Sequence, residues 1–512
     1  MTDTREMKTA MQGVSEAQAG SANGHQPEAD KTSSEMSIIQ TDYLVVGAGA
    51  TAMSFVDTLL SETDADVTMV DRRYRPGGHW NDAYPFVRLH QPSAYYGVSS
   101  RELSNWTKDK IGLNQGLYGL ASAAEVLAHF EQVLQDRFLP SGRVRWLPMS
   151  EYSAGVDGAH HVRSLTSGES VRIEIRKKLV DGTLARTEIP ATHQPKFSIT
   201  PGVACVTPNR LPDIRRPYPA YAVVGSGKTG MDACIWLIQN GVPPSRIRWI
   251  MSRDAWLLNR ENFQPGANDV DRTLGSVIGQ FEAITEATSV ADLFSKLEQR
   301  SLLMRIDKTI EPTTYRCAIV SPAELAQLQR IADIVRLGHL RAIEPMRIVL
   351  DKGALDADPD TLYVDCSARA LTPPPGIPVF DGDRINLLMV RFCQPLFSAA
   401  LIAFVESHFN DPVEKNAFCA VVPTPDRPTD WLRMWATTLA NQARWQRNER
   451  VRNWLAQCRL NNAVAMMRGA KPNDEVKLER FKEAAAKAGA AAAKLPDLIA
   501  SFACGKGDGT HE

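Results

Sequence analysis

Two glycine-rich turns carry most of the chemistry that this sequence can offer. Residues 47–52 read Gly-Ala-Gly-Ala-Thr-Ala and follow the apolar run 43–46, and residues 225–230 read Gly-Ser-Gly-Lys-Thr-Gly and follow the apolar run 221–224. Such a turn, placed between a buried strand and a helix, lets the backbone approach a pyrophosphate and aims the helix N-terminus at it. Two turns predict two dinucleotide sites, and a flavin with a nicotinamide is the combination most often found together. The alternative is a pair of ordinary turns from unrelated α/β units.

The residue that ends the next strand distinguishes the two turns. After the first turn, the strand 66–70 ends in Asp71, whose carboxylate can accept hydrogen bonds from ribose hydroxyls and would repel a 2′-phosphate. After the second turn, the strand 247–251 ends in Ser252 and Arg253. A guanidinium there can pair with a 2′-phosphate in two parallel hydrogen bonds. The first turn therefore favours FAD and the second favours NADPH.

The length, net charge, apolar runs and cysteine spacing of the chain limit the functions that it could have. A chain of 512 residues has room for two or three domains, and a net charge of −1 gives no electrostatic reason to bind nucleic acid or an anionic membrane. No apolar run is long enough to span a bilayer, and the polar N-terminus is unlike a signal peptide. The eight cysteines contain no C-x-x-C pair, which argues against zinc and against a redox-active disulfide. We therefore expect a cytoplasmic protein with reduced thiols and no metal.

The chain is predicted to be an α/β protein with two Rossmann-like domains, in which the NADPH domain is inserted into a discontinuous FAD domain. The predicted parts are a disordered tail (1–37), the FAD domain (38–216), the NADPH domain (217–345) with a helical insertion (about 268–334), the second FAD part with C-terminal helices (346–468), and an Ala/Lys-rich tail (469–512). Residues 347–350 and 362–364 are predicted to be strands that return to the FAD domain. Residues 475–493 are compatible with a surface helix or with disorder.

Two further segments give a family resemblance. Residues 75–80 (Arg-Pro-Gly-Gly-His-Trp) and 84–88 (Tyr-Pro-Phe-Val-Arg) resemble the G-G-x-W and Y-P-x-x-R stretch of class B flavin monooxygenases, the group that holds flavin-containing monooxygenases and Baeyer–Villiger enzymes. Residues 251–260 resemble, more loosely, the Ser/Arg-then-aromatic stretch after the NADPH turn of those enzymes. The resemblance covers about residues 40–265 well and is weaker over 330–410.

The resemblance implies a reaction. NADPH would reduce FAD, and O₂ would then add to the flavin to give a C4a-(hydro)peroxide that oxygenates a nitrogen, a sulfur or a carbonyl carbon of a small organic substrate. The enzyme would have to bind both cofactors and keep water away from the flavin. Its partners would be that substrate and O₂, and the sequence leaves a homo-oligomer open.

The resemblance also implies roles for individual residues. Near FAD it would place Gly47, Gly49 and Ala52 at the pyrophosphate, Asp71 at the ribose, Gly78 and Trp80 along the flavin, and Asp383 at the ribitol. Near NADPH it would place Gly225, Gly227 and Gly230 at the pyrophosphate, with Ser252 and Arg253 at the 2′-phosphate. The alternatives are a core role for Trp80, a solvated charge at Arg253 and a surface turn at Asp383.

The catalytic position is expected just after the Tyr-Pro pair. Where the flavin-containing monooxygenases carry an asparagine near the reactive edge of the flavin, counting from Tyr84 leads to His90, with Gln91 next to it. A neutral imidazole could donate a hydrogen bond or shuttle a proton there, and Gln91 could take the role of the amide. The alternative is a non-catalytic role, in which His90 only forms structural hydrogen bonds in a proline-containing loop.

The sequence also departs from the family. The F-x-G-x-x-x-H fingerprint that precedes the second glycine turn is replaced by residues 189–197, Ile-Pro-Ala-Thr-His-Gln-Pro-Lys-Phe. Three other functions therefore stay open: an NADPH-dependent flavin oxidoreductase without oxygen transfer, a flavin-dependent halogenase, and a non-catalytic NADPH sensor.

Overall fold

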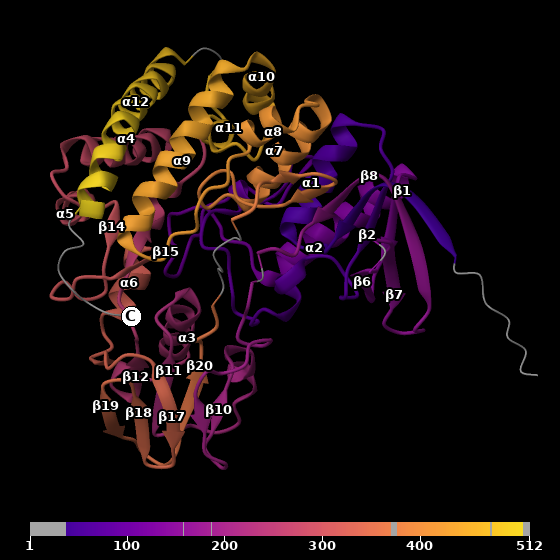
Figure 1. The fold of residues 1–512 in the computed structure, drawn as a ribbon. Coiled ribbons are helices and arrows are strands. Elements are labelled where there is room, and N and C mark those ends of the chain that lie inside the picture. Colours follow the sequence, from indigo (N-terminus) through magenta and orange to yellow (C-terminus); the bar gives the residue numbers. More distant parts are fainter. Residues whose placement is uncertain (1–36, 157, 186, 370–375, 472–473, 505–512) are drawn as a thin grey trace, which may run out of the picture.

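The computed structural model describes residues 37–156, 158–185, 187–369, 376–471 and 474–504. The expected disordered tail therefore lies almost entirely outside the described residues. Within them the chain is a mixed α/β protein whose two larger sheets are mainly parallel (Figure 1). The helices are α1 Ala50–Glu62, α2 Ala123–Val133, α3 Lys228–Gln239, α4 Val270–Glu286, α5 Val290–Gln299, α6 Pro322–Leu328, α7 Pro395–His408, α8 Pro412–Phe418, α9 Pro428–Arg447, α10 Glu449–Gln457, α11 Asn462–Met466 and α12 Glu475–Cys504.

The first sheet has the strand order β21-β22-β8-β1-β2-β5, with the β6-β7 hairpin attached to β8. Its strands are β1 Ile38–Val46, β2 Val67–Val70, β5 Val144–Leu147, β6 Ser150–Ala154, β7 His160–Ser164, β8 Ser170–Asp181, β21 Phe380–Asp381 and β22 Arg384–Asn386. A short hairpin, β3 Gly97–Val98 with β4 Arg101–Glu102, lies apart from it. We call this sheet with α1, α2 and α7 the first unit.

The second sheet has the order β10-β20-β11-β12-β16 and is parallel throughout. Its strands are β10 Cys205–Val206, β11 Ala220–Val224, β12 Ile247–Ile250, β16 Asp333–Val335 and β20 Thr361–Asp365. We call this sheet with α3 and α6 the second unit. Since β22 pairs with β8 after the second sheet is complete, the chain leaves the first sheet and later returns to it.

Two smaller sheets complete the fold. One contains β13 Ala255–Asn259, β14 Leu303–Met304 and β15 Thr314–Val320, and the other contains β9 Ser198–Ile199, β17 Leu340–Glu344, β18 Arg347–Leu350 and β19 Gly353–Asp356. The prediction that residues 347–350 and 362–364 rejoin the first sheet is therefore wrong. The former form β18 between β17 and β19, and the latter lie in β20, beside β11. An apolar strand pattern reports burial and does not reveal which sheet edge the strand joins.

The helical regions differ from expectation in a similar way. Residues 268–334 contain α4, α5 and α6, but also the strands β14, β15 and β16. In the Ala/Lys-rich tail, Glu475–Cys504 form α12, so that the helix alternative for residues 475–493 is confirmed, and α12 packs on α4 and α9 through the buried Ala491, Leu495 and Leu498. No helix in the described ranges is long and apolar enough to cross a membrane.

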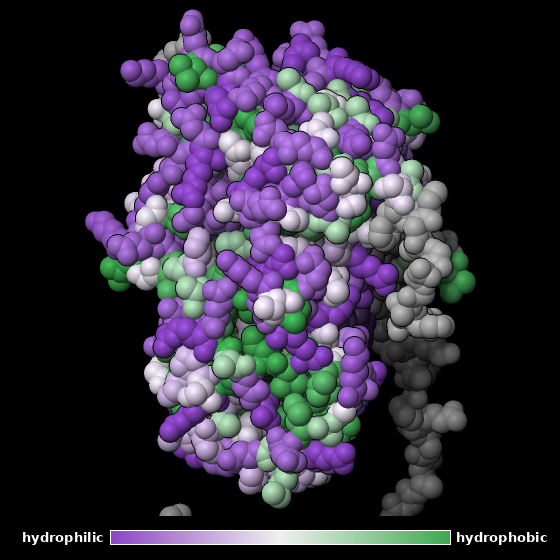
Figure 2. Space-filling model, turned by 90° about the vertical axis from the view of Figure 1, so that its left-hand side faces the viewer, coloured by the Kyte–Doolittle hydropathy of each residue, from purple (hydrophilic) through white to green (hydrophobic). Residues whose placement is uncertain are grey.

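Two helices of the first unit start at the same end. The Ser54 hydroxyl in the first turns of α1 donates to the Leu396 carbonyl at the start of α7 (2.8 Å), and His408 at the end of α7 lies 2.8 Å from Glu62 at the end of α1. The helices are therefore parallel neighbours. In Figure 1 the second unit lies at the bottom, and the C-terminal helices cover the top left. Figure 2 shows that hydrophobic side chains gather in the lower half of one face, at the height of the second unit.

Candidate functional site

The first glycine turn joins β1 to α1 and carries its own acidic residue. Asp71, at the end of β2, accepts a hydrogen bond from the Ala48 backbone N–H (2.6 Å) and another from the Arg73 N–H (2.7 Å). The Asp71 side chain is buried, and Ala52 is fully buried in the first turn of α1. The turn itself therefore holds the Asp71 carboxylate beside the N-terminus of α1.

The Gly77–Gly78 pair closes over this turn. The Gly77 N–H donates to the Ala48 carbonyl (2.8 Å), and Gly78 has a φ of +56°. A Cβ atom on Gly78 would lie 2.9 Å from the Gly49 Cα, closer than protein atoms pack, so only glycine fits. The structure thus brings together Gly47, Gly49 and Gly78, which lie about thirty residues apart in the sequence.

Trp80 lies two residues after Gly78 and is buried. Its indole N–H donates to the Tyr96 hydroxyl (2.9 Å), and the two rings meet edge to face. Trp80 is therefore a core residue of the first unit, and its place two residues after Gly78 keeps it near the first turn.

The second glycine turn joins β11 to α3. Gly225 has a φ of +123°, a Cβ atom there would lie 2.5 Å from the Cys366 carbonyl, and the Trp249 indole donates to the Gly225 carbonyl (2.8 Å). A Cβ atom on Gly230 would overlap with the Gly225 carbonyl oxygen. Around Gly227, by contrast, no described atom lies within 4 Å of an added Cβ. The turn is packed against its own sheet and leaves space at the N-terminus of α3.

One segment connects the two turns. Beyond Gly78, the Tyr84 hydroxyl donates to Asp232 on α3 (2.8 Å), and Asp232 also pairs with Lys228. Two residues later, the Phe86 ring stacks on Trp236 of the same helix, with 5.3 Å between centroids. Burial, followed by the charge of Asp232, raises the pKa of Tyr84 far above its ordinary value, so this phenol stays protonated. The segment therefore fixes the first turn relative to α3.

His90 lies at the end of this segment, beside the second unit. Burial, followed by the charges of Lys228 and Arg260, lowers the pKa of His90 to about 3, so the imidazole is neutral at physiological pH. The buried Arg260 donates to the His90 carbonyl (2.9 Å) and pairs with Glu324 (2.7 Å). Gln91 is half-buried next to it. The loop is thus anchored through its backbone.

Arg253 does not project freely. Its guanidinium pairs with Asp426 (3.1 Å), whose other carboxylate oxygen accepts a hydrogen bond from Arg316 of β15 (2.6 Å). Burial alone would raise the pKa of Asp426, but Arg316 and Arg253 together hold it below its ordinary value. Two guanidinium groups share one carboxylate, so this cluster carries an excess positive charge beside the half-buried Ser252.

Asp383 is not brought to the site. It lies in the exposed turn between β21 and β22, at the start of β22, whereas the glycine turns follow the carboxyl ends of parallel strands. The expectation that Asp383 contacts a ribitol is therefore not supported, and the alternative of a surface turn describes it. Strand direction decides this, because ligands of open parallel sheets bind at the carboxyl edge.

Sequence reasoning missed one bond. Cys317 of β15 and Cys393, just before α7, form a disulfide between residues that are 76 positions apart. The expectation of reduced thiols throughout is wrong for this pair, while Cys205, Cys234, Cys366, Cys419 and Cys458 are free among the described residues. The C-x-x-C criterion detects only neighbours in sequence, and folding makes this pair.

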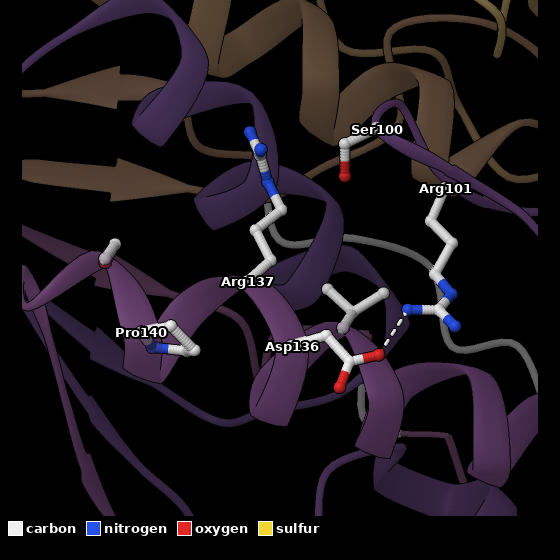
Figure 3. A pocket seen from close by; sticks show the side chains of 7 residues that line it. Ser100, Arg101, Asp136, Arg137 and Pro140 are labelled. Atoms are coloured by element: carbon white, nitrogen blue, oxygen red, sulfur yellow. Dashed lines mark hydrogen bonds and ion pairs between the residues drawn. The ribbon is translucent and has the colours of Figure 1, made fainter.

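A separate surface hollow lies near the end of α2 (Figure 3). Its lining residues are Ser100, Arg101, Val133, Asp136, Arg137, Pro140 and Ser141. Arg101 pairs with Asp136 (2.7 Å), and Arg137 pairs with the buried Asp57 (2.9 Å). Because both cations are neutralised, the hollow offers no free charge to a ligand, and it lies away from both glycine turns.

Comparison with known proteins gives the family. The chain is 49% identical over 423 residues to the uncharacterized proteins Mb2023 of Mycobacterium bovis and Rv2000 of Mycobacterium tuberculosis, which covers 83% of this chain and 78% of each relative. The chain belongs to the family of these mycobacterial proteins. No family model matches it.

Solved structures add neighbours for this family member. They include cyclohexanone-bound cyclohexanone monooxygenase (12% identity, TM-score 0.47, 73% of this chain and 87% of that one). They also include the flavin-containing monooxygenase of Stenotrophomonas maltophilia (15% identity, TM-score 0.42, 74% of this chain and 99% of that one).

Proposed function

We propose that this protein is an FAD- and NADPH-dependent monooxygenase that oxygenates a nitrogen, a sulfur or a carbonyl carbon of a small organic substrate. The observation that carries the proposal is the segment from Gly77 to Phe86, which lies on the first glycine turn and reaches α3 behind the second. A segment that contacts the first turn and the helix that follows the second would hold two bound cofactors at a fixed separation, as hydride exchange between them requires.

The residues at the first turn fit FAD. Gly49 has a φ of −70°, and an added Cβ would meet only the Gly78 Cα, at 3.8 Å, so the space before it is free for a pyrophosphate. Gly47, Gly49 and Ala52 would hold that pyrophosphate, Asp71 would accept from the ribose, and Gly78 and Trp80 would border the flavin. When bound, FAD reduced by NADPH would supply the activation of O₂.

The residues at the second turn fit NADPH. Gly225, Gly227 and Gly230 would hold the pyrophosphate at the N-terminus of α3, where Gly227 leaves open space. Ser252 and Arg253 would bind the 2′-phosphate. The phosphate would replace part of the contact between Arg253 and Asp426, and the second guanidinium on that carboxylate keeps the cluster attractive to an anion.

Between the turns, the chain's own side chains would position the reactants. The neutral His90 imidazole would donate a hydrogen bond to the reacting oxygen or carry a proton, with Gln91 as an amide donor beside it. The stacked Phe86 and Trp236 would limit the access of water.

The experiment is a sequence of three measurements on the purified protein. A flavin spectrum should be present, NADPH should bleach it under nitrogen faster than NADH does, and O₂ should then give oxygenated product from a panel of amines, thioethers and ketones. The absence of bound flavin would refute the proposal. Bleaching followed by hydrogen peroxide alone would favour the oxidoreductase without oxygen transfer, and halogenated product in the presence of halide would favour the halogenase.

A further inference from the structure

The Cys317–Cys393 disulfide joins the two halves of the proposed cofactor site. Cys317 lies on β15, directly after Arg316, which shares Asp426 with Arg253. Cys393 lies two residues before Pro395, the first residue of α7. The bond therefore connects the strand that supports the proposed phosphate cluster with the helix start in the first unit.

Cys393 also lies on the side of the first glycine turn. α1 and α7 are parallel, and Ser54 in α1 donates to Leu396 in the first turn of α7. The helix α1 begins at Ala50, directly after Gly49, so the start of α7 faces the same end of the first sheet as the turn. A group just ahead of α7 thus lies at the end of the unit where a dinucleotide at the first turn would bind.

Both cysteines have unusual backbone conformations. Cys317 has a φ of +58° and Cys393 a φ of +50°, in the left-handed region that residues other than glycine rarely adopt. Such strain persists where the surrounding structure enforces it, and it clusters at functional sites. Cys317 and Cys393 are both half-buried. The free cysteines Cys234, Cys366 and Cys419, by contrast, are buried in the core.

We propose that Cys317 and Cys393 form a redox-active pair that accepts two electrons from NADPH through the flavin. This inference rests on the proposed FAD and NADPH sites and goes beyond oxygen transfer. One NADPH gives a hydride, one proton comes from solvent, the S–S bond breaks, two S–H bonds form, and NADP⁺ is released with the flavin oxidised again. The N-terminus of α7 would stabilise the Cys393 thiolate as the first sulfur released.

The chemistry has a structural consequence. In the disulfide state, β15 is crosslinked to the loop before α7, and reduction breaks this crosslink. Reduction by NADPH would thus remove a crosslink from the strand that carries Arg316, while its pairing with β13 remains. The first reduction of the protein by NADPH would therefore break the crosslink between β15 and the loop before α7.

The decisive experiment uses differential alkylation of the unmodified holoprotein under nitrogen. Iodoacetamide first blocks the accessible thiols and its excess is removed. NADPH is then added to one of two samples, and N-ethylmaleimide labels the remaining thiols of both after denaturation, so that buried free cysteines cancel in the difference. We expect about two new thiols per chain, with the maleimide on the Cys317 and Cys393 peptides. Flavin bleaching without new thiols would overturn the inference and leave the proposed function standing. A protein without bound flavin would fail the proposed function and the inference together.

Variants provide a second measurement. Bleaching of the flavin in the unmodified protein should take about two equivalents of NADPH, because the first equivalent passes to the disulfide. Cys393→Ser should need about one equivalent, and Cys205→Ser, at a free half-buried cysteine in β10, should still need about two. Equal requirements for all three proteins would contradict the proposal.

The apoprotein gives a readout that needs no cofactor. Dithiothreitol should reduce the Cys317–Cys393 bond in the folded protein without denaturant, and oxidised glutathione should re-form the same pair, as found by peptide mapping. A bond that resists dithiothreitol until the protein unfolds would be a buried structural crosslink, and the inference would fall.

Discussion

The two glycine turns follow the same course from strand to helix, yet the chain holds charge beside them by different means. At the first turn, the backbone N–H of Ala48 in the turn itself fixes the Asp71 carboxylate at 2.6 Å. At the second, Asp426 holds Arg253, and the two residues are 173 positions apart. The charge beside the first turn is therefore held by local geometry, whereas the charge beside the second is held by a segment that is distant in the sequence.

The turns also differ in how they are closed. Gly78 covers Gly49 so closely that a Cβ on Gly78 would lie 2.9 Å from it, whereas nothing lies within 4 Å of a Cβ on Gly227. A Cβ atom added at Gly49 makes an ordinary contact with the Gly78 Cα at 3.8 Å and one added at Gly227 meets no described atom within 4 Å, whereas one added at Gly78 lies too close to Gly49. This contrast gives variants that separate ligand binding from folding.

The largest effects are expected from Gly49→Val and Gly227→Val. Both residues have ordinary negative φ values, so each variant should fold and lose only its own ligand. Gly49→Val should purify with little FAD, and Gly227→Val should keep FAD but bind NADPH about a hundredfold more weakly, a loss of about 3 kcal/mol. Flavin absorbance and NADPH titration measure the two outcomes. If either variant lost both ligands, or neither, the assignment of one dinucleotide to each turn would be wrong.

Arg253→Ala should weaken NADPH binding by roughly tenfold to a hundredfold, or about 1.5–3 kcal/mol, and should leave NADH binding almost unchanged. Asp426→Asn should act in the opposite direction, since it removes the negative charge that competes with the phosphate. Isothermal titration with both nucleotides checks this. Arg210→Ala removes an exposed arginine paired with Asp213 and serves as the control. Equal preference for NADH and NADPH in the unmodified protein would contradict the role of Arg253.

Gly78→Ala should destabilise the apoprotein by about 1–3 kcal/mol, because the left-handed φ and the close approach to Gly49 both penalise a Cβ atom. Gly227→Ala is the matched control and should leave the unfolding free energy near that of the unmodified protein. Denaturant unfolding of the apoproteins makes the comparison. Equal stability of the two variants would mean that the two turns are closed in the same way.

Tyr84→Phe should cost about 1 kcal/mol, the typical loss for one hydrogen bond, and should slow reduction of the flavin by NADPH a few-fold. The reason is that the Tyr84–Asp232 bond fixes the first turn relative to α3. Tyr43→Phe removes a comparable bond to Glu406, remote from α3, and should lower stability without slowing the reduction. Stopped-flow absorbance under nitrogen separates the two, and identical rates would remove the positioning role of Tyr84.

The smallest effect is expected for the pH dependence of flavin reduction when His90 is replaced. A pKa lowered from 6.5 to about 3 leaves the imidazole neutral above about pH 5, so His90→Gln should not move the pH profile of flavin reduction between about pH 6 and 9. Oxygenation should become less efficient, with hydrogen peroxide formed in place of product. A titration near pH 6.5 that disappears in the variant would show that the ring ionises in this range.

Local sequence signals were sufficient to predict the two glycine turns and the residues that lie next to them. The glycine spacing placed both strand–turn–helix units correctly, and Asp71 lies at the first turn because a strand that pairs with β1 must end beside it. The same reasoning brought Gly78 into the set, although its contact with Gly49 became visible only in the folded chain. These features follow from backbone geometry within about thirty residues.

The long-range features were decided by tertiary structure alone. The sequence by itself determined two glycine turns, an acid beside one and an arginine after the other. It could not determine that β20 joins the second sheet, that Asp383 lies in a surface turn, or that Asp426 pairs with Arg253. It also gave no signal for Cys317–Cys393, since nothing in the residues around either cysteine identifies the other. The physical reason is the same in each case: short-range steric rules fix the course of a turn, but the burial of whole strands and helices decides which distant segments meet.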